Sequence, residues 1–245
     1  MTISGKLGRK ATRSDPRTLR LAAYLPKELP PAPDAVNWMK TKTDWGEMAN
    51  DRLGDCTIAA VAHAIQVWYN ATGNALTYDD KTVVDYYGRW AGYDPSDPDT
   101  DQGAVELDIL NQWRKEGFGS EKLIAYADPD PHNTEHVKQA VWRFGLVYIG
   151  LALPLTAQGQ EVWDYVPKTK KNAPWSWGGH AVVVPRYDEE FLYCITWGQV
   201  QKMTWRFWQE YCEESHALLS GVWKDRATSD FNLPNLESDL SAVTS

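Results

Sequence analysis

Cys56 has the sequence context of a reactive thiol. Apolar residues from Ile58 to Trp68 recur at helical spacing and Asp55 is placed to cap the start, so Cys56 is predicted at a helix N-terminus. Unpaired N–H groups and the positive end of the helix dipole stabilise a thiolate there. Asn50 lies upstream across a turn at Gly54, and its amide can fold back as an oxyanion donor. A buried structural thiol is the alternative, since free cysteines are among the most buried residues.

Short segments around Cys56 and farther along the chain resemble the papain family of cysteine peptidases. In that family the mature enzymes open on Val-Asp-Trp, the nucleophile lies in C-G-[SA]-C-[WY], and the catalytic His and Asn follow on later strands. The matching segments here are Val36-Asn37-Trp38, Asn50 with Gly54 and Cys56, Gln102-Gly103, Gly179 to Val184, and Ile195 to Gly198. The resemblance covers about residues 36–200, with His180 near the family's expected separation from the nucleophile.

The resemblance implies roles for these residues. Cys56 would be the nucleophile, His180 the general base paired with it, and the Asn50 amide with the Cys56 backbone N–H the oxyanion donors. We expect the Cys56 and His180 side chains to meet within about 4.5 Å. The residues implied as substrate cleft or shield are Gln102, Gly103, Trp177 and Trp197. Apart from the resemblance, His180 also fits a core-strand histidine whose ring is satisfied.

Three departures from the family bear on catalysis. Ile195 falls where the family has the Asn that orients the imidazole, and its neighbour Thr196 is expected on the opposite face of the strand. Asn50 is one methylene shorter than the family's Gln. Asp55 puts a negative charge beside Cys56, which opposes thiolate formation unless the carboxylate points outward as a cap.

The elements that must position these residues change type along the chain. Helices are predicted at about 79–90, 104–116 and 134–144, strands at 146–153, 181–187 and 191–197, and a short helix from Thr204 to about Cys212. This order predicts an α+β, papain-like two-lobe fold, with a helical lobe against an antiparallel sheet lobe. We predict a basic, Pro-rich arm over 1–35, a papain-like domain over 36–224 and an acidic tail over 225–245.

Composition narrows the compartment and the partners. A net charge of −8 disfavours nucleic acid as a partner. No run reaches the roughly 20 apolar residues of a membrane span, and none has a signal peptide's pattern. Three cysteines are too few for a disulfide scaffold. A cytoplasmic or assembly-associated protein is therefore expected.

The arm over 1–35 begins with a basic segment, residues 1–20. Within residues 1–20 the basic residues are Lys6, Arg9, Lys10, Arg13, Arg17 and Arg20, and Asp15 is the only acidic one. We interpret it as a solvated tail or a docking strip for an acidic assembly partner. Because it is shorter than the family's long inhibitory pro-segment, self-inhibition by that route is not expected.

Two segments resemble metal-binding motifs, but neither predicts a metal site. No other cofactor is predicted. His132 to His136 reads H-x-x-E-H, but Asn133 or Thr134 is the expected N-cap, which leaves His132 outside the helix. Asp97, Asp99 and Asp101 alternate as in a calcium loop, but the required Gly is replaced by Gln102. His63 lies two helical turns from Cys56 and fits a packed histidine better than a base.

The leading hypothesis is a thiol hydrolase that cleaves peptide or amide bonds of a peptide or protein substrate through an acyl-enzyme on Cys56, with His180 as base. Two alternatives stay open. One is a catalytically impaired papain-like module that serves as a binding or structural component of an assembly. The other is an acyl transferase or isopeptidase that uses the same pair with a different acceptor.

Overall fold

A buried helix, α1 (Cys56–Ala71), lies between the sheet and the other helices of its layer. All but two of its residues, Tyr69 and Asn70, are buried, and it packs along β5 (Gly178–Tyr187). A helix that is apolar on every side is stable only when protein surrounds it. The packing therefore fixes the N-terminus of α1 against the sheet, and with it Cys56.

The computed structural model describes residues 5–13, 15, 18–26, 30–167, 170–226 and 232–244. Arg17 of the predicted arm lies outside this range. The remaining helices are α2 (Asp80–Ala91), α3 (Glu106–Glu116), α4 (Thr134–Phe144), α5 (Trp205–Tyr211) and α6 (Leu233–Thr244). The remaining strands are β1 (Val36–Asn37), β2 (Leu123–Ala127), β3 (Val147–Leu153), β4 (Val162–Trp163), β6 (Phe191–Thr196), β7 (Gln199–Thr204) and β8 (Cys212–Ser220).

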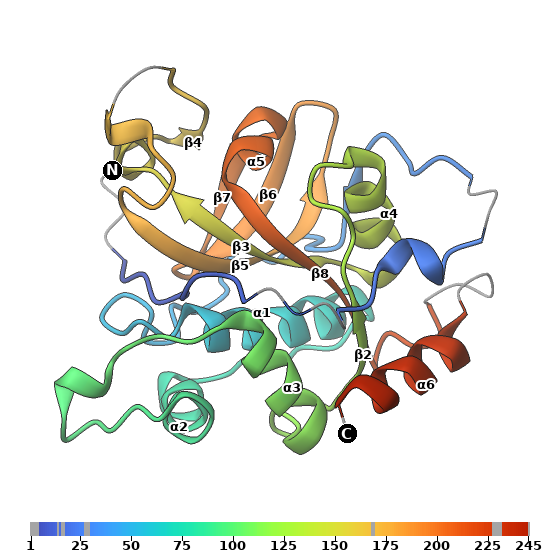
Figure 1. The fold of residues 1–245 in the computed structure, drawn as a ribbon, viewed down its shortest axis with the longest axis horizontal. Helices are drawn as coiled ribbons and strands as arrows, with labels where there is room; N and C mark the ends of the chain where they lie inside the picture. The colour runs from blue at the N-terminus through green and yellow to red at the C-terminus, as the bar shows by residue number, and fades with distance from the viewer. Residues whose placement is uncertain are drawn as a thin grey trace.

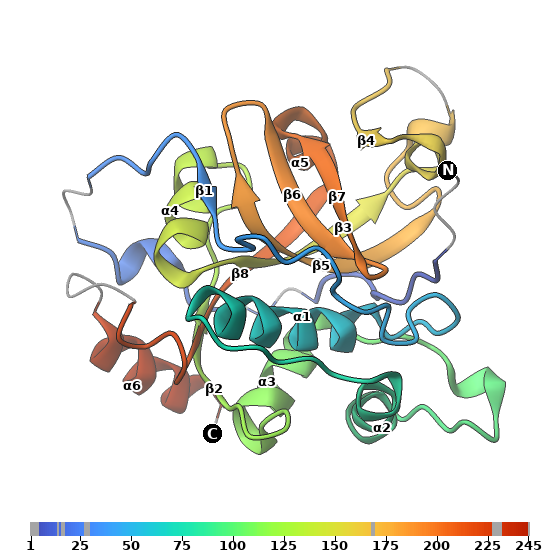
Figure 2. The same cartoon turned by 180° about the vertical axis from the view of Figure 1, so that it is seen from behind.

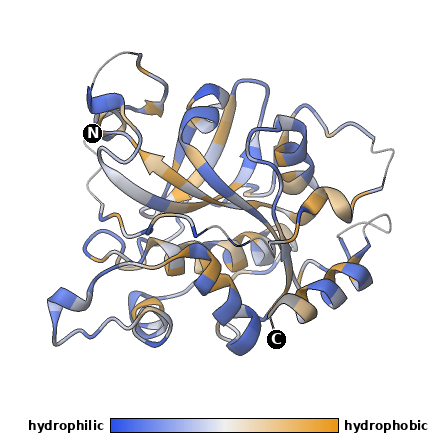
Figure 3. Ribbon diagram, in the orientation of Figure 1, coloured by the Kyte–Doolittle hydropathy of each residue, from blue (hydrophilic) through white to orange (hydrophobic). Residues whose placement is uncertain are grey.

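The strands form one mixed sheet in the order β2-β8-β3-β5-β6-β7-β4, with β1 paired to β5. Its pairings are antiparallel except that of β4 with β7. Every residue of β3 is buried, as expected of a central strand covered on both faces. Helices α1, α2 and α3 lie on one face of this sheet, and α4 and α5 lie on the other (Figures 1 and 2). Apolar residues concentrate on β3 and its neighbours, whereas the outer helices carry polar residues (Figure 3).

The predicted α+β class, with a helical layer against a largely antiparallel sheet, is confirmed. The predicted helices match α2, α3 and α4 to within two residues, and the Asn133 side chain accepts from the His136 N–H as the N-cap of α4. The strands β2, β7 and β8, the two-residue strands β1 and β4, and the helix α6 were missed. The start of β8 is polar, and α6 buries only Leu236 and Leu240 within the described part of the predicted acidic tail. The predicted domain limits themselves stay a prediction.

The predicted arm does not extend into solvent where the structure describes it. Residues 5–13 run between the sheet and the helices α1 and α3 (Figure 1). The Arg9 N–H donates to the Gly179 carbonyl at 3.1 Å, the Lys10 N–H to the Ala104 carbonyl at 2.9 Å, and the Ala104 N–H to the Gly8 carbonyl at 2.9 Å. These backbone hydrogen bonds on two sides make the segment part of the folded body, so the interpretation as a solvated tail is wrong for residues 6–10.

Within the part of the chain that the structure describes, none of the helices has the length and apolar character needed to span a bilayer.

Candidate active site

Cys56 lies at the N-terminus of α1, against the strand that carries His180. Its side chain is buried, and its sulfur accepts a hydrogen bond from the Ala181 N–H at 3.4 Å. Ala181 directly follows His180 on β5. The thiol and the imidazole are thus brought to one place by the packing of α1 on the sheet. Their predicted separation of about 4.5 Å stays a prediction.

His180 is oriented by Thr196. Its Nε2 lies 2.6 Å from the Thr196 Oγ1, and its ring stacks on Trp197 with centroids 4.5 Å apart and planes 16° apart. The expectation that Thr196 points away from His180 and that Ile195 holds the position of the orienting Asn is therefore wrong. The register of β5 on β6 shifts between Val183 and Arg186, and Ile195 instead pairs with Val183 inside the sheet. Because neighbours in a strand face opposite sides, Thr196 presents its hydroxyl to the imidazole.

The second ring nitrogen of His180 is free for proton transfer. Among the described residues, the buried His180 Nδ1 has no hydrogen-bond partner. In the tautomer whose Nε2–H donates to Thr196, Nδ1 keeps an unused lone pair, which a general base needs. The arrangement supplies an oriented imidazole without an Asn.

Burial keeps both reactive groups uncharged in this closed arrangement. It raises the pKa of Cys56 to about 12, although the N–H groups of Ala181 and Gly8 partly oppose the rise. It lowers the pKa of His180 to about 3, and the positive charge of Arg9 lowers it further. Since an ion pair of thiolate and imidazolium needs both groups charged, the closed site holds a neutral thiol and a neutral imidazole.

Asp55 does not point outward as a helix cap. It is fully buried and makes no capping hydrogen bond to the start of α1. Burial raises the pKa of its carboxyl to about 8, with the Asn50 amide opposing the rise. At pH 7 the group is therefore mostly protonated, so its opposition to a Cys56 thiolate is weaker than the sequence predicts.

Asn50 directs its amide at the arm. Its Nδ2 donates to the Lys6 carbonyl at 3.2 Å and to the Leu53 carbonyl at 3.0 Å, and the backbone carbonyl of Asn50 accepts from the Lys6 N–H at 2.8 Å. Within the described ranges no hydrogen bond joins it to Cys56. Trp197 also approaches the Lys6 carbonyl, with its Nε1 at 3.5 Å. The Lys6 backbone carbonyl thus occupies the Asn50 amide, one of the two donors that the sequence assigns to an oxyanion.

Three glycines let the arm lie directly over the thiol. A Cβ on Gly8 would come within 1.8 Å of the Gly54 carbonyl oxygen, and a Cβ on Gly103 within 1.7 Å of the Gly8 carbonyl oxygen. Gly103 also has φ of +67°, a region that side chains disfavour. Backbone packed this closely leaves no room for a substrate, so the site is closed by residues 6–10 of its own chain.

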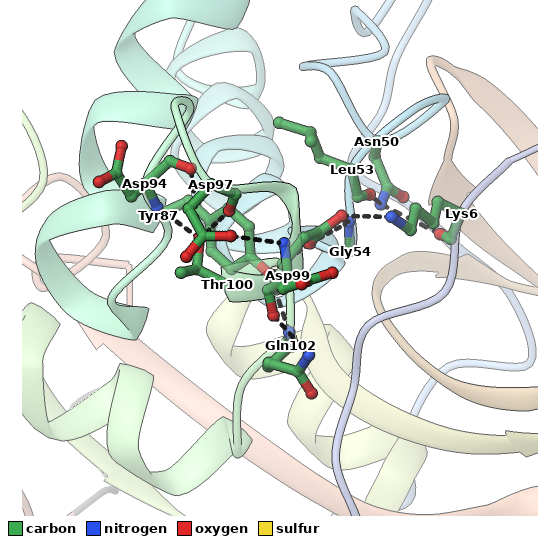
Figure 4. A network of polar contacts seen from close by, with 12 residues as sticks. Lys6, Asn50, Leu53, Gly54, Tyr87, Asp94, Asp97, Asp99, Thr100 and Gln102 are labelled. Carbon is green, nitrogen blue, oxygen red and sulfur yellow. Dashed lines mark hydrogen bonds and ion pairs between the residues drawn. The ribbon is translucent and has the colours of Figure 1, made fainter.

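The acidic loop before Gly103 anchors the same region, as Figure 4 shows. Asp101, buried in its side chain, pairs with Lys6 and accepts from the Gly54 N–H at 2.9 Å and the Tyr87 hydroxyl at 2.7 Å. The Asp101 side chain is therefore held inside the fold and is not exposed to solvent. Gln102 is exposed and donates to the Asp99 carbonyl at 2.7 Å, so its side chain lies away from the arm.

The remaining candidates lie around His180. Trp197 covers the imidazole, and Trp177 is the next ring outward, with centroids 5.7 Å apart. His63 is a packed histidine, since its buried Nε2 lies 3.0 Å from the Gly46 carbonyl. Gly8, Arg9 and Thr196 had no signal in the sequence that marked them as site residues. Only Thr196 had been considered, as the nearest polar substitute.

Known structures share this architecture. The cysteine protease xylellain from Xylella fastidiosa superposes with a TM-score of 0.62 at 15% identity, over 89% of this chain and 97% of that one. The bromelain protease from Ananas comosus, in complex with the E64 inhibitor, gives 0.54 at 13% identity, over 76% and 98%. The digestive procathepsin L 3 of Tenebrio molitor gives 0.57 at 11% identity, over 82% and 74%. These likenesses show a papain-like fold. The sequence itself matches no family model and no curated protein.

Replacing Gly8 with valine should uncover the thiol. The new side chain would meet the backbone of Gly54, so the arm must lift at this residue. We expect the iodoacetamide rate at Cys56 to rise about 10-fold or more at pH 7, because water enters and the pKa of the thiol falls. Gly221→Val, at a glycine with open space around it, is the matched control. An equal rate in Gly8→Val and wild type would show that the arm does not shield Cys56.

Removing the Thr196 hydroxyl should make the His180 imidazole a weaker acceptor of the proton from the Cys56 thiol. In the Gly8→Val background, Thr196→Ala should lower the alkylation rate at pH 6 by about 10-fold, because a hydrogen bond to an ionised partner is lost. The loss should shrink above pH 9, where the thiol ionises unaided. Thr196→Ser keeps the hydroxyl and should retain the acid limb of the profile. The role given to Thr196 is wrong if all three profiles coincide.

Proposed function

We propose, on the premise of this papain-like fold, that the protein is a thiol hydrolase that cleaves peptide or amide bonds through an acyl-enzyme on Cys56. The observation that carries the proposal is the state of His180. Its Nε2 is held by Thr196, its Nδ1 has no partner among the described residues, and the next N–H along β5 touches the Cys56 sulfur. Residues placed this way suit transfer of a proton from the thiol to the imidazole.

The reaction would follow the usual order of acyl transfer. The Cys56 sulfur attacks the carbonyl carbon while His180 takes the thiol proton, and the oxyanion is met by the Asn50 amide and the Cys56 N–H. The carbon–nitrogen bond breaks as His180 returns the proton to the leaving amine. Water then attacks the thioester with His180 as base, which releases the acid and restores the thiol.

The arm has to leave the site before this cycle begins. In the closed arrangement the Gly8 N–H approaches the sulfur, and the Lys6 carbonyl occupies the Asn50 amide. Acyl transfer needs a carbonyl carbon beside the sulfur instead. Opening would admit water and substrate together and would bring the pKa values of Cys56 and His180 closer, which favours the ion pair. On this proposal the short arm itself blocks the site, although it is shorter than the family's pro-segment.

A second function has its own support. The tightness of the arm, with Gly8 packed on the backbone of Gly54, also fits a catalytically impaired module that never opens. In that case the closed site would be a structural feature of a binding protein. The two proposals differ in whether Cys56 reacts and turns over once the arm is displaced.

E-64, the inhibitor bound in the bromelain structure, separates these proposals. We expect Gly8→Val to gain one inhibitor mass on Cys56 and to hydrolyse a mixed peptide library, whereas wild type reacts slowly. Cys56→Ala in the same background should do neither, and His180→Ala should lose turnover by at least about 100-fold. A free amine acceptor that shifts the product from acid to amide would indicate an acyl transferase. An accessible Cys56 that takes iodoacetamide but neither E-64 nor substrate would favour the impaired module.

A further inference from the structure

The side chain of Arg9 lies wholly inside the protein, among carboxylates. Its Nε donates to Glu214 Oε1 at 2.8 Å and lies 3.3 Å from Glu106 Oε1, and its Nη1 donates to Glu213 Oε2 at 3.1 Å. The side chain of Arg9 has no exposed area, and neither has that of Glu106. A charge buried this way is tolerated only when it is paired. The carboxylates therefore form a receptor for one guanidinium.

The pocket around this guanidinium is shaped to admit it. Gly150 on β3 lies beside it, and a Cβ at this residue would come within 2.1 Å of the Arg9 Nε. The ring of Trp175 lies against the group on another side, 5.3 Å from the Arg9 Cζ. An open pocket of about 170 Å³, lined in part by Glu213 and Glu214, adjoins the cluster. The receptor thus has a fitted wall and a connection to solvent.

Arg9 does not exhaust the polar groups that converge here. Both carboxylate oxygens of Glu106 and the Nε2 of His216 are buried without a hydrogen-bond partner among the described residues. That Nε2 lies 3.6 Å from Glu106 and 3.7 Å from Glu214, while its Nδ1 is 2.5 Å from Asp128. The group of Glu106, Glu214 and His216 also has the spacing of metal ligands, but Arg9 lies against it in this structure. Without Arg9 in the pocket, the carboxylates of Glu106 and Glu214 would be buried with no guanidinium to pair with.

The pocket borders the reactive groups. Arg9 follows Gly8, whose N–H approaches the Cys56 sulfur, and its own N–H donates to the carbonyl of Gly179, the residue before His180. A side chain that enters the pocket is therefore attached to a backbone that passes over the thiol. This neighbourhood is where a peptide substrate would lie once the arm had moved.

We propose that this pocket, lined by Glu106, Glu213, Glu214 and Gly150, is a subsite for an arginine side chain of the peptide substrate, and that Arg9 occupies it in the closed form. The proposal rests on the hydrolase function proposed above. The planar, always charged guanidinium presents donors in several fixed directions, which matches three carboxylates set around one point. A lysine ammonium is a compact point charge and cannot reach all three at once. The preference is thus for arginine over lysine, and for either over a neutral residue.

The test uses the full chain with Gly8→Val and Arg9→Ala, so that the arm no longer fills the pocket. One measurement needs no turnover: binding of a synthetic peptide with the sequence of residues 5–13, by calorimetry and by the rise in melting temperature that binding to the folded state produces. The peptide is compared with analogues that carry lysine or citrulline in place of Arg9. We expect the arginine peptide to bind about 10-fold or more tightly than the citrulline analogue, which has the same shape without the charge.

The second measurement is cleavage of fluorogenic peptide amides that differ only in arginine, lysine, citrulline or leucine at one position before the scissile bond. We expect kcat/KM to favour arginine over citrulline by about 10-fold or more at one such position. Glu214→Gln should abolish the preference by removing the charge. Gly150→Ala should do so by filling the space, with every charge retained. Gly221→Ala is the matched control and should leave the preference unchanged.

The outcomes separate the two proposals. Arginine-selective peptide binding without cleavage would support the subsite and overturn the hydrolase. Cleavage with no arginine preference at any position would support the hydrolase and overturn the subsite. Selective binding of the arm peptide combined with unselective cleavage would make the pocket an anchor for the arm alone, which also overturns the proposal.

Discussion

A guanidinium with no exposed area must be neutralised where it lies, and in this protein that requirement ties the N-terminal arm to the sheet. Arg9 comes from the arm, Glu106 from the start of α3, and Glu214 from β8. Breaking such a pair by removing one partner leaves an uncompensated buried charge, which costs about 3–5 kcal/mol. The position of Gly8 over the thiol follows from this anchor, because the two residues are adjacent. The closure of the site therefore depends on an electrostatic contact beside it.

The closure of the site and the uncharged state of Cys56 and His180 have the same physical cause. The segment that covers Cys56 and His180 excludes water, and exclusion of water penalises the charged forms of both groups. Arg9 adds a second effect, since its positive charge lowers the pKa of His180 directly. Moving the arm would reverse both effects together. On the proposed function, displacement of the arm would make Cys56 reactive without any change in the residues that perform the reaction.

The papain-like fold, shared with structures at 11–15% identity, brings three features of the candidate site together. The helix N-terminus with Cys56, the strand with His180 and the indole that covers the imidazole are present. The hydrogen-bond partner of the imidazole is the Thr196 hydroxyl, whose Oγ1 lies 2.6 Å from the His180 Nε2. The imidazole needs an oxygen within hydrogen-bond distance of its Nε2, and more than one type of side chain can supply that oxygen.

Local patterns in the sequence were enough for the α+β class, the helix that begins at Cys56 and the strand that carries His180, because periodicity and turn residues act over a few residues. The partner of His180 was decided by tertiary structure. A shift of one residue in register exchanges the faces of Ile195 and Thr196, and nothing within the strand itself fixes that register. The arm was likewise predicted to be solvated, because its residues are basic. The carboxylates that pair with the buried Arg9 come from residues about 100 and 200 positions away. Pairings over such distances are set by the packing of the whole fold, which a local pattern does not contain.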